Sequence, residues 1–378
     1  MKLILLAAVI FFETNAWAKD KVVKIGIASN FSQVSSSSSN PYGDYFRNGI
    51  KLAIKKNQAS LKDAGIKLEI VEFDYGDSQY AVLKAAKKAC QSDVAIVLGY
   101  VYSSHALLAA PIHKKCKLPL LTPSASANRL GKMGSYIHQA TFDNSFQGEV
   151  LAEYAIETLK AKKALIIPIA NCAYCQDLGI AFKKSFEKLG GNVTGEVSVL
   201  EEGGDFSDVA KKAKQQHFDV VVVPNHELAS ARIIHKLVKL GIKKPFLGGD
   251  GWGNVGEQFF NVIGDQKIEG YSLSHWLSDL PTQKSKIFVA DFKSNYDKVP
   301  NDTAVLSFDA TNLLIQSLLS TKDHTRSGVE KSLGSIESFD GVTGSFIFQK
   351  NRAPKKSIIL LKNEGNKFSF LKVIEPRK

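Results

Sequence analysis

Two kinds of segment, which differ in the spacing of their apolar residues, alternate along the chain. Short apolar runs, typical of buried strands, are followed by segments with an apolar residue every three or four positions, the spacing of an amphipathic helix. In the first part, strand runs cover residues 22–28, 67–74, 94–100, 118–124 and 136–141, and helical segments cover 45–65, 78–92 and 104–116. Strands that alternate with helices of this length predict βαβ units and a parallel sheet with helices on both faces.

The same alternation repeats in the second part. Strand runs cover residues 164–170, 192–199, 219–225 and 245–250, and helical segments cover 147–163, 177–191, 206–217 and 228–242. Between the two sets stands "ATFDNSFQG", which is not a Gly/Ser-rich or Pro-rich linker. We therefore expect an α/β protein with two closely coupled, Rossmann-like lobes.

The last part has a different order of elements. Three helical segments (286–297, 304–321 and 328–336) precede three strand runs (344–350, 356–362 and 367–375). Helices followed by hairpin-like strands do not indicate a third domain here, and we expect them to add layers to the two lobes.

The N-terminus has the pattern of a secretory signal. Lys2 precedes an apolar run, and Ala16-Trp17-Ala18 is a small-x-small cleavage site. The run is about ten residues long, half of the roughly twenty that a membrane span needs. We predict that residues 1–18 are a signal peptide and that the mature, exported chain begins near Lys19.

Length and charge narrow the possible partners. Roughly 360 residues remain after cleavage, enough for two ordinary domains. The formal net charge is +12, but the lysines are scattered in pairs along helical faces, as in "IKKNQ" and "VAKKAKQQ". Such pairs are typical of solvated faces, so we do not expect nucleic acid as a partner.

Four cysteines in an exported protein indicate disulfides. Cys90 lies four residues before Val94, and Cys116 lies four residues before Leu120, each of which belongs to an apolar run. If those runs are neighbouring parallel strands, both cysteines reach the same sheet edge, within disulfide distance. Cys172 and Cys175 form "CAYC" and are close enough to bridge each other, although the same spacing occurs in thiol–disulfide oxidoreductases. A thioredoxin-like domain is far smaller than this chain, which argues against that enzyme.

Candidate ligand contacts follow the strands, because open α/β sheets bind ligands beyond the carboxyl ends of their strands. The first set offers hydroxyl groups and helix N-termini, which favour a carboxylate. The second set offers aromatic rings and an acid in "FLGGDGWGN", which suits an ammonium group. The division predicts a zwitterionic ligand, with contacts from Tyr42, Ser103, Ser104, Ser124, Ser126, Tyr174, Asp250 and Trp252.

Each of these residue types also has a purely structural use. A serine at a helix start is an ordinary N-cap, an aspartate between glycines is an ordinary turn residue, and rings commonly pack in cores. No metal or cofactor is expected, because the candidate histidines lack ligand spacing: His105, His113, His226 and His275.

The order and spacing of many short segments resemble the type I periplasmic binding proteins, in the leucine/isoleucine/valine-binding branch that serves ABC importers. The segments include "VKIGIA", "YGDYFRNGIKLAI", "VLGYVYSSHALLAAPI", "LPLLTPSASANRL", "FDNSFQGEVLAEYA", "KLGIKKPFLGGDGWGN" and "FDGVTGSFIFQK". The resemblance covers essentially the whole mature chain. It implies a periplasmic monomer, not an enzyme, that binds a small amino acid or related amide of aliphatic or branched-chain type and passes it to an ABC permease. A sensor that presents the same fold to a signalling partner is the alternative.

Carried over by position, the resemblance assigns the ligand hydroxyl to Ser103 and the amine-binding acid to Asp250. It places further contacts at Ser124, Ser126, Tyr42 and Tyr174. The chain departs from the family in having Cys175 where relatives have glycine, Asp250 where they often have glutamate, a serine run at 35–39, and Asn225-His226 in place of a ring.

The resemblance also implies that three strands cross between the lobes. We expect the crossings near Thr141, Leu273 and Phe339. The first lobe then contains residues 22–141 plus 274–338, and the second contains 142–273 plus 339–378. Two lobes joined in this way close on a ligand by hinge motion.

Overall fold

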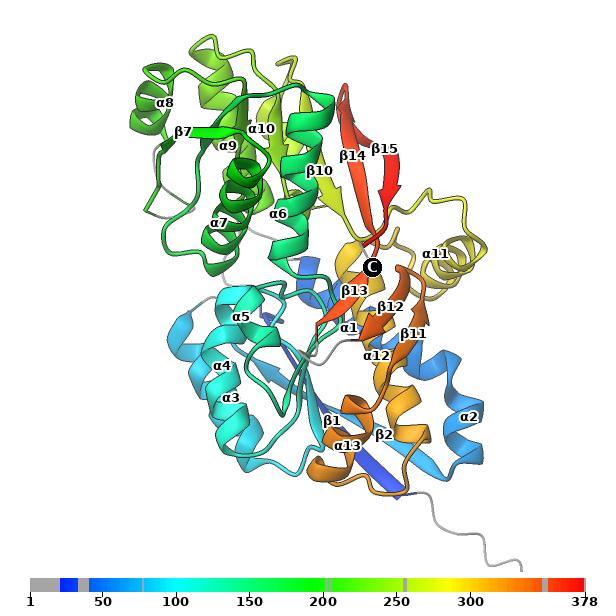
Figure 1. Ribbon diagram of the computed structural model, residues 1–378. Helices are drawn as coiled ribbons and strands as arrows, with labels where there is room; N and C mark the ends of the chain where they lie inside the picture. Colours follow the sequence, from blue (N-terminus) through cyan, green and yellow to red (C-terminus); the bar gives the residue numbers. More distant parts are fainter. Residues whose placement is uncertain are drawn as a thin grey trace, which may run out of the picture.

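Two α/β lobes stack end to end in the computed structural model (Figure 1). The structure describes residues 21–32, 41–76, 78–200, 203, 206–253, 257–348 and 353–376, without the side chains of residues 41, 42 and 257. The predicted signal peptide and the serine run at 35–39 lie outside the described residues. Each lobe has a largely parallel sheet flanked by helices, which confirms the expected fold class.

The first lobe is built on a five-stranded parallel sheet in the order β2-β1-β3-β4-β5. Strand β1 is buried on both faces from Ile25 to Ser29, because helices cover both sides of the sheet. The strands are β1 (Lys21–Ser29), β2 (Ile66–Asp74), β3 (Ile96–Gly99), β4 (Leu120–Thr122) and β5 (Ile137–Gln139). The helices are α1 (Pro41–Lys56), α2 (Gln58–Asp63), α3 (Gln79–Gln91), α4 (Ser103–Lys115) and α5 (Asn128–Gly131).

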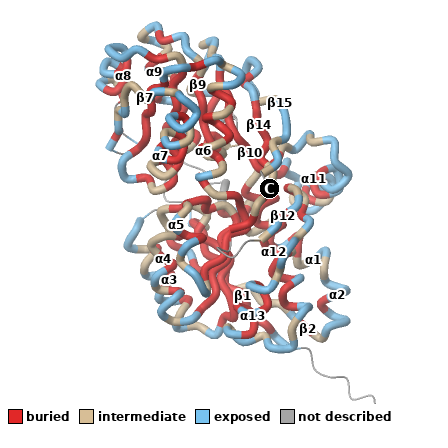
Figure 2. The backbone as a smooth tube through the Cα atoms, viewed as in Figure 1, coloured by how far each residue is buried: buried red, intermediate tan, exposed pale blue. Residues whose placement is uncertain are grey.

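The second lobe is built on a seven-stranded sheet in the order β15-β14-β10-β9-β8-β6-β7, in which β14 pairs antiparallel with β10. The strands are β6 (Lys163–Ile166), β7 (Asn192–Glu196), β8 (Val220–Val222), β9 (Phe246–Gly248), β10 (Gly270–Ser274), β14 (Ile358–Glu364) and β15 (Lys367–Ile374). The helices are α6 (Asn144–Glu153), which continues as a π-helix (Tyr154–Thr158), α7 (Ala173–Lys188), α8 (Ser207–Lys214), α9 (Glu227–Lys239), α10 (Glu257–Ile263) and a short 3₁₀ helix (Asp250–Trp252). Figure 2 shows the buried backbone concentrated along the sheets of both lobes.

The remaining elements return to the first lobe. They are α11 (Gln283–Tyr296), α12 (Asp302–Leu319), α13 (Arg326–Gly334) and a small sheet of β11 (Ser338–Gly341), β12 (Gly344–Phe348) and β13 (Pro354–Lys356). Phe346 of β12 is buried in the first-lobe core. The carboxylate of Asp309 in α12 accepts N–H bonds from Val342 at 2.9 Å and Thr343 at 2.8 Å.

The small sheet corrects one expected lobe boundary. Because β11, β12 and β13 pack on the first lobe, the third crossing lies between Lys356 and Ile358, and the prediction near Phe339 was wrong. The first crossing runs from β5 to α6 through Thr141, and the second runs from β10 to α11 through His275.

Both predicted disulfides are formed. Cys90 near the end of α3 bonds Cys116 after α4, with their Cα atoms 5.9 Å apart. Cys172 bonds Cys175 at the start of α7, with their Cα atoms 5.2 Å apart. No helix among the described residues is long and apolar enough to cross a membrane.

A histidine in the first-lobe core predicts acid sensitivity. His113 of α4 is fully buried, and burial lowers its pKa from 6.5 to about 4. Between these values the unfolded chain binds one more proton than the folded chain, so the free energy of unfolding falls as the pH is lowered through this window. The slope from this group is about 1.4 kcal/mol per pH unit.

We expect His113→Leu to reduce this slope in urea titrations at pH 6.5 and 4.5. The exposed His217 provides the matched control, and His217→Leu should leave the slope unchanged. Equal slopes in the wild type and His113→Leu would contradict the assignment.

Candidate functional site

A cavity of about 120 Å³ lies between the lobes, where strands of both sheets end. A single water needs about 10–15 Å³ on this scale, so the cavity has room for a small molecule. The first lobe lines it with Val101, Tyr102, Ser103, Ser124, Ser126, Asn301, Asp302, Thr303 and Leu306. The second lobe contributes Tyr174, His226, Glu227, Asp250, Gly251 and Gly253, and the second crossing contributes His275.

The first-lobe wall offers backbone donors. Helix α4 begins at Ser103, and the side chain of its N-cap residue, Tyr102, makes no capping hydrogen bond. The Ser103 hydroxyl accepts the Ala127 N–H at 3.1 Å, and the Ser124 hydroxyl donates to the Val101 carbonyl at 2.9 Å. The two hydroxyls therefore fix the loops, while the first turn of α4 presents N–H groups and the positive end of the helix dipole to an anion.

The second-lobe wall carries a buried carboxylate. Asp250 follows β9, and its N–H donates to Gln147 Oε1 of α6 at 3.0 Å. Its Oδ2 lies 2.9 Å from His275 Nε2, whereas Oδ1 is buried and has no hydrogen-bond partner among the described residues. A buried oxygen without a partner is costly, and a ligand N–H group would satisfy it.

Asp250 is ionised at neutral pH. Burial raises the pKa of the Asp250 carboxyl, but hydrogen bonding with His275, supported by Tyr174 and Gln147, outweighs burial and lowers the net pKa below its ordinary value. Burial lowers the pKa of His275 to about 4, so the imidazole beside Asp250 is neutral. The cavity thus contains a carboxylate that is charged and only partly hydrogen-bonded.

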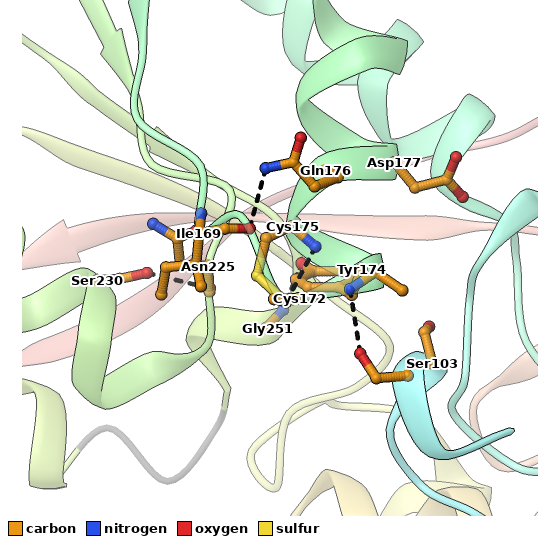
Figure 3. Close-up of a disulfide and its surroundings, with 12 residues drawn as sticks. Ser103, Ile169, Cys172, Tyr174, Cys175, Gln176, Asp177, Asn225, Ser230 and Gly251 are labelled. Carbon is orange, nitrogen blue, oxygen red and sulfur yellow. Dashed lines mark hydrogen bonds between the residues drawn. A yellow bond between two sulfur atoms is a disulfide. The ribbon is translucent and has the colours of Figure 1, made fainter. Parts of the chain in front are cut away.

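A disulfide fixes the ring beside Asp250. Tyr174 lies between Cys172 and Cys175 at the start of α7 (Figure 3). Its hydroxyl accepts the Gly251 N–H at 2.8 Å, and its ring stacks on His226 with centroids 5.1 Å apart. The His226 ring also meets the edge of Tyr102 from the first lobe, at 5.1 Å. These rings therefore form a continuous wall across the cleft.

The same disulfide limits metal binding. Within the described part of the chain, Cys172, Cys175 and His226 are the only three side chains of ligand type whose donor atoms lie within 4.8 Å of one another. Both sulfur atoms are held in the disulfide, so they are not thiolates, the form in which cysteine binds metals. Of this group of three described side chains, only the His226 imidazole is therefore in a form that binds a metal.

The lobes also touch beside the cavity. The Ser104 hydroxyl of the first lobe accepts the Ala173 N–H of the second lobe at 3.0 Å. The Asn128 N–H donates to Asp177 Oδ2 at 2.7 Å. The lobes are therefore closed on each other, and Ser104, predicted to contact ligand, contributes to the contact between lobes.

Five of the eight predicted contacts line the cavity: Ser103, Ser124, Ser126, Tyr174 and Asp250. Trp252 does not, and its prediction as a cover over the ligand was wrong. Its indole is completely buried in the second-lobe core against Phe259, and its Nε1–H donates to the Val223 carbonyl at 2.9 Å. The side chain of Tyr42 lies outside the described residues.

Several cavity residues were missed because they come from the start of α12. The sequence shows a helix start here, since Asn301 caps the N–H of Ala304 at 3.1 Å. Nothing in the local pattern indicates that Asp302 and Leu306 face the second lobe, because the fold brings this helix end to the cleft. His275 was considered only as a metal ligand, His226 also as part of the Asn225-His226 departure from the family, and Glu227 was not among the predicted contacts.

Glycine at 251 allows the backbone to approach Tyr174 closely. A Cβ atom at Gly251 would lie 2.6 Å from Tyr174 Cε1 and 3.0 Å from the Asn225 carbonyl oxygen. Overpacking of this kind costs about 1–3 kcal/mol, so Gly251→Ala should displace Tyr174 and weaken ligand binding by roughly 5- to 150-fold in calorimetric titrations. Gly203→Ala is the control, because a Cβ there would meet nothing within 4 Å. Unchanged affinity in Gly251→Ala would show that the ligand does not depend on this ring position.

Comparison with known proteins places the chain in one family. A family model described as a periplasmic binding protein matches residues 22–366. The Leu/Ile/Val-binding protein of Escherichia coli (strain K12) is 24% identical over 266 residues, which is 70% of this chain and 67% of that protein. The Leu/Ile/Val/Thr-binding protein of Salmonella typhimurium has the same identity and coverage.

Solved structures show the same fold. The leucine binding protein LivK of Thermotoga maritima superposes with a TM-score of 0.84 at 23% identity, over 94% of this chain and 99% of that chain. The branched-chain amino acid binding protein LivJ of Streptococcus pneumoniae, in complex with isoleucine, superposes with a TM-score of 0.82 at 26% identity, over 94% of this chain and 100% of that chain.

Proposed function

Because the chain belongs to the periplasmic binding protein family, we propose that it captures a small amino acid between its lobes and delivers it to the permease of an ABC importer. One observation carries the proposal: a charged, buried carboxylate with a free oxygen and an uncapped helix N-terminus line the same cavity. The first suits an ammonium group and the second a carboxylate. An α-amino acid carries both groups.

The side chain of the ligand is expected to be aliphatic. Val101, Leu306 and the Tyr174 ring supply apolar wall to the cavity. Relatives named for binding leucine, isoleucine and valine support this class. The polar His226 and Glu227 also line the cavity and would suit a small polar side chain as well.

The proposed role is binding without catalysis, by a monomer in the periplasm. Cys175 is fully buried and Cys172 is nearly so, beneath the contact between the lobes. A protein thiol cannot reach this disulfide in the closed form, so the "CAYC" segment is better suited to holding Tyr174 than to thiol–disulfide exchange. The periplasmic location rests on the family and on the predicted signal peptide.

A thermal-shift screen tests the proposal. The mature protein is unfolded and refolded to remove carried ligand, then heated with L-amino acids, their amides, decarboxylated analogues and sugars. A ligand at one hundred times its dissociation constant raises the free energy of unfolding by about 2.7 kcal/mol. We expect shifts with intact aliphatic amino acids and none with isoamylamine, which lacks the carboxylate. Shifts only with amides or sugars would refute the assigned roles of Asp250 and α4.

A further inference from the structure

The three crossings between the lobes meet at one histidine. His275 lies on the second crossing, directly after β10. On the first crossing, the Phe142 ring stacks on the imidazole with centroids 4.0 Å apart, and Thr141 Oγ1 lies 3.5 Å from His275 Nε2. On the third crossing, Lys356 Nζ lies 3.4 Å from His275 Nδ1. All four side chains are buried or nearly so.

The lysine determines the tautomer of this histidine. An ammonium group can only donate hydrogen bonds, so the contact with Lys356 requires an unprotonated Nδ1. The ring proton then lies on Nε2 and is donated to Asp250 Oδ2, 2.9 Å away. Burial, helped by the charge of Lys356, lowers the pKa of His275 to about 4 and keeps the ring neutral. The hydrogen bonds are thus all donated in one direction: Lys356 donates to His275, and His275 donates to Asp250.

Acidic groups of both lobes act on the Lys356 ammonium group. Lys356 is completely buried, and burial lowers its pKa to about 8. The acids that oppose this shift are Asp309 and Asp302 from the first lobe and Asp250 from the second. A change in the relative position of the lobes therefore changes the field that acts on the chain of three residues.

We propose that His275 is a positioning residue that ties the Asp250 carboxylate to the hinge, so that lobe closure and presentation of Asp250 Oδ1 to the ligand depend on each other. The inference rests on the proposed function, because Oδ1 is the oxygen assigned to the ligand amine. With Oδ2 held by His275, Oδ1 is left for the ligand. By linkage, a ligand that binds Oδ1 better in the closed form also stabilises closure.

The test compares two substitutions at the same position. His275→Leu removes both ring nitrogens, whereas His275→Gln retains one acceptor for Lys356 and one N–H donor for Asp250. L-Leucine binding is measured by calorimetry, and lobe closure is followed by small-angle X-ray scattering. We expect His275→Leu to weaken leucine binding by roughly 10- to 150-fold, the effect of removing a hydrogen bond to a buried charge, and His275→Gln to recover most of it.

The matched control is His113→Leu, which removes another fully buried histidine with a pKa of about 4, far from the hinge. It should lower stability without changing leucine affinity or closure. Lys356→Met provides a second route if His275→Leu does not fold, and it should also weaken binding. Wild-type affinity and closure in folded His275→Leu or Lys356→Met would overturn the proposal.

A nitrogen-15 NMR measurement separates this inference from the proposed function. In the ligand-free wild type we expect the His275 resonances of a neutral ring protonated at Nε2, and in Lys356→Met we expect a mixture of tautomers. A ring protonated at Nδ1 in the wild type would overturn the inference even if leucine binds. Failure of every amino acid to bind the wild type would instead refute the proposed function.

Discussion

Asp250→Asn is expected to abolish most of the affinity for amino acids. The substitution keeps the shape of the side chain and an oxygen for the His275 Nε2–H, but it removes the charge that faces the ligand amine. Loss of one partner of a buried charged pair costs about 2–5 kcal/mol, which corresponds to roughly 30- to 5,000-fold in the dissociation constant. Calorimetric titration with L-leucine measures this loss directly.

The matched variant is Asp302→Asn, which alters the cavity acid of the first lobe. Asp302 Oδ2 already accepts the Ser274 hydroxyl at 3.1 Å, so we expect a smaller effect than at Asp250. A larger loss in Asp302→Asn than in Asp250→Asn would move the amine site to the start of α12. Circular dichroism of both variants verifies that each is folded.

Removal of the Cys90–Cys116 disulfide should cause the largest loss of stability. The bond closes a loop with a sequence separation of 26 and ties α3 to α4. Loop-closure entropy for this length corresponds to about 3.5 kcal/mol, against about 2 kcal/mol for the separation of 3 at Cys172–Cys175. Urea unfolding of Cys90→Ala/Cys116→Ala and of Cys172→Ala/Cys175→Ala measures both.

The two double variants should differ in which property they impair, stability or ligand affinity, as well as in the size of the stability loss. The Cys90–Cys116 bond is remote from the cavity, so its loss should spare ligand affinity at temperatures where the protein is folded. The Cys172–Cys175 bond flanks Tyr174, whose hydroxyl accepts the Gly251 N–H, so its loss should weaken binding more than it lowers stability. Equal effects of both variants on leucine affinity would contradict this division.

The sequence predicted the parts of the fold that depend on local periodicity. The alternation of strand and helix defined both lobes, and the positions of Cys90 and Cys116 shortly before two neighbouring strands predicted their bond. The expected equal offsets were wrong, because Val97 pairs with Leu120, seven residues after Cys90 and four after Cys116. Residues at the carboxyl ends of strands, such as Ser124 and Tyr174, were found for the same reason. Parallel strands all direct their following loops to one edge, so chain position alone identifies these residues.

The errors concern one local turn and contacts made by elements distant in sequence. Trp252 follows Asp250 closely, but one turn of 3₁₀ helix directs the indole into the core while the carboxylate faces the cleft. The small sheet of β11, β12 and β13 joins the first lobe because Asp309 accepts a hydrogen bond from its turn and Phe346 packs in the first-lobe core. Strand periodicity cannot show these contacts. The role of His275 depends on three crossings that lie more than sixty residues apart, and no local pattern reveals their meeting point.

The division of the first lobe between two distant stretches of chain has a consequence for biogenesis. The core around Ile25 and Ile27 is completed by α12 and by Phe346, and the sheet of the second lobe gains its β14 and β15 strands still later. A ribosome delivers these residues last, so neither lobe can finish folding before Lys356 has been made. Long-range closure of this kind is slow. The delay suits a chain with a predicted export signal, because an unfinished polypeptide can still pass through a narrow membrane pore.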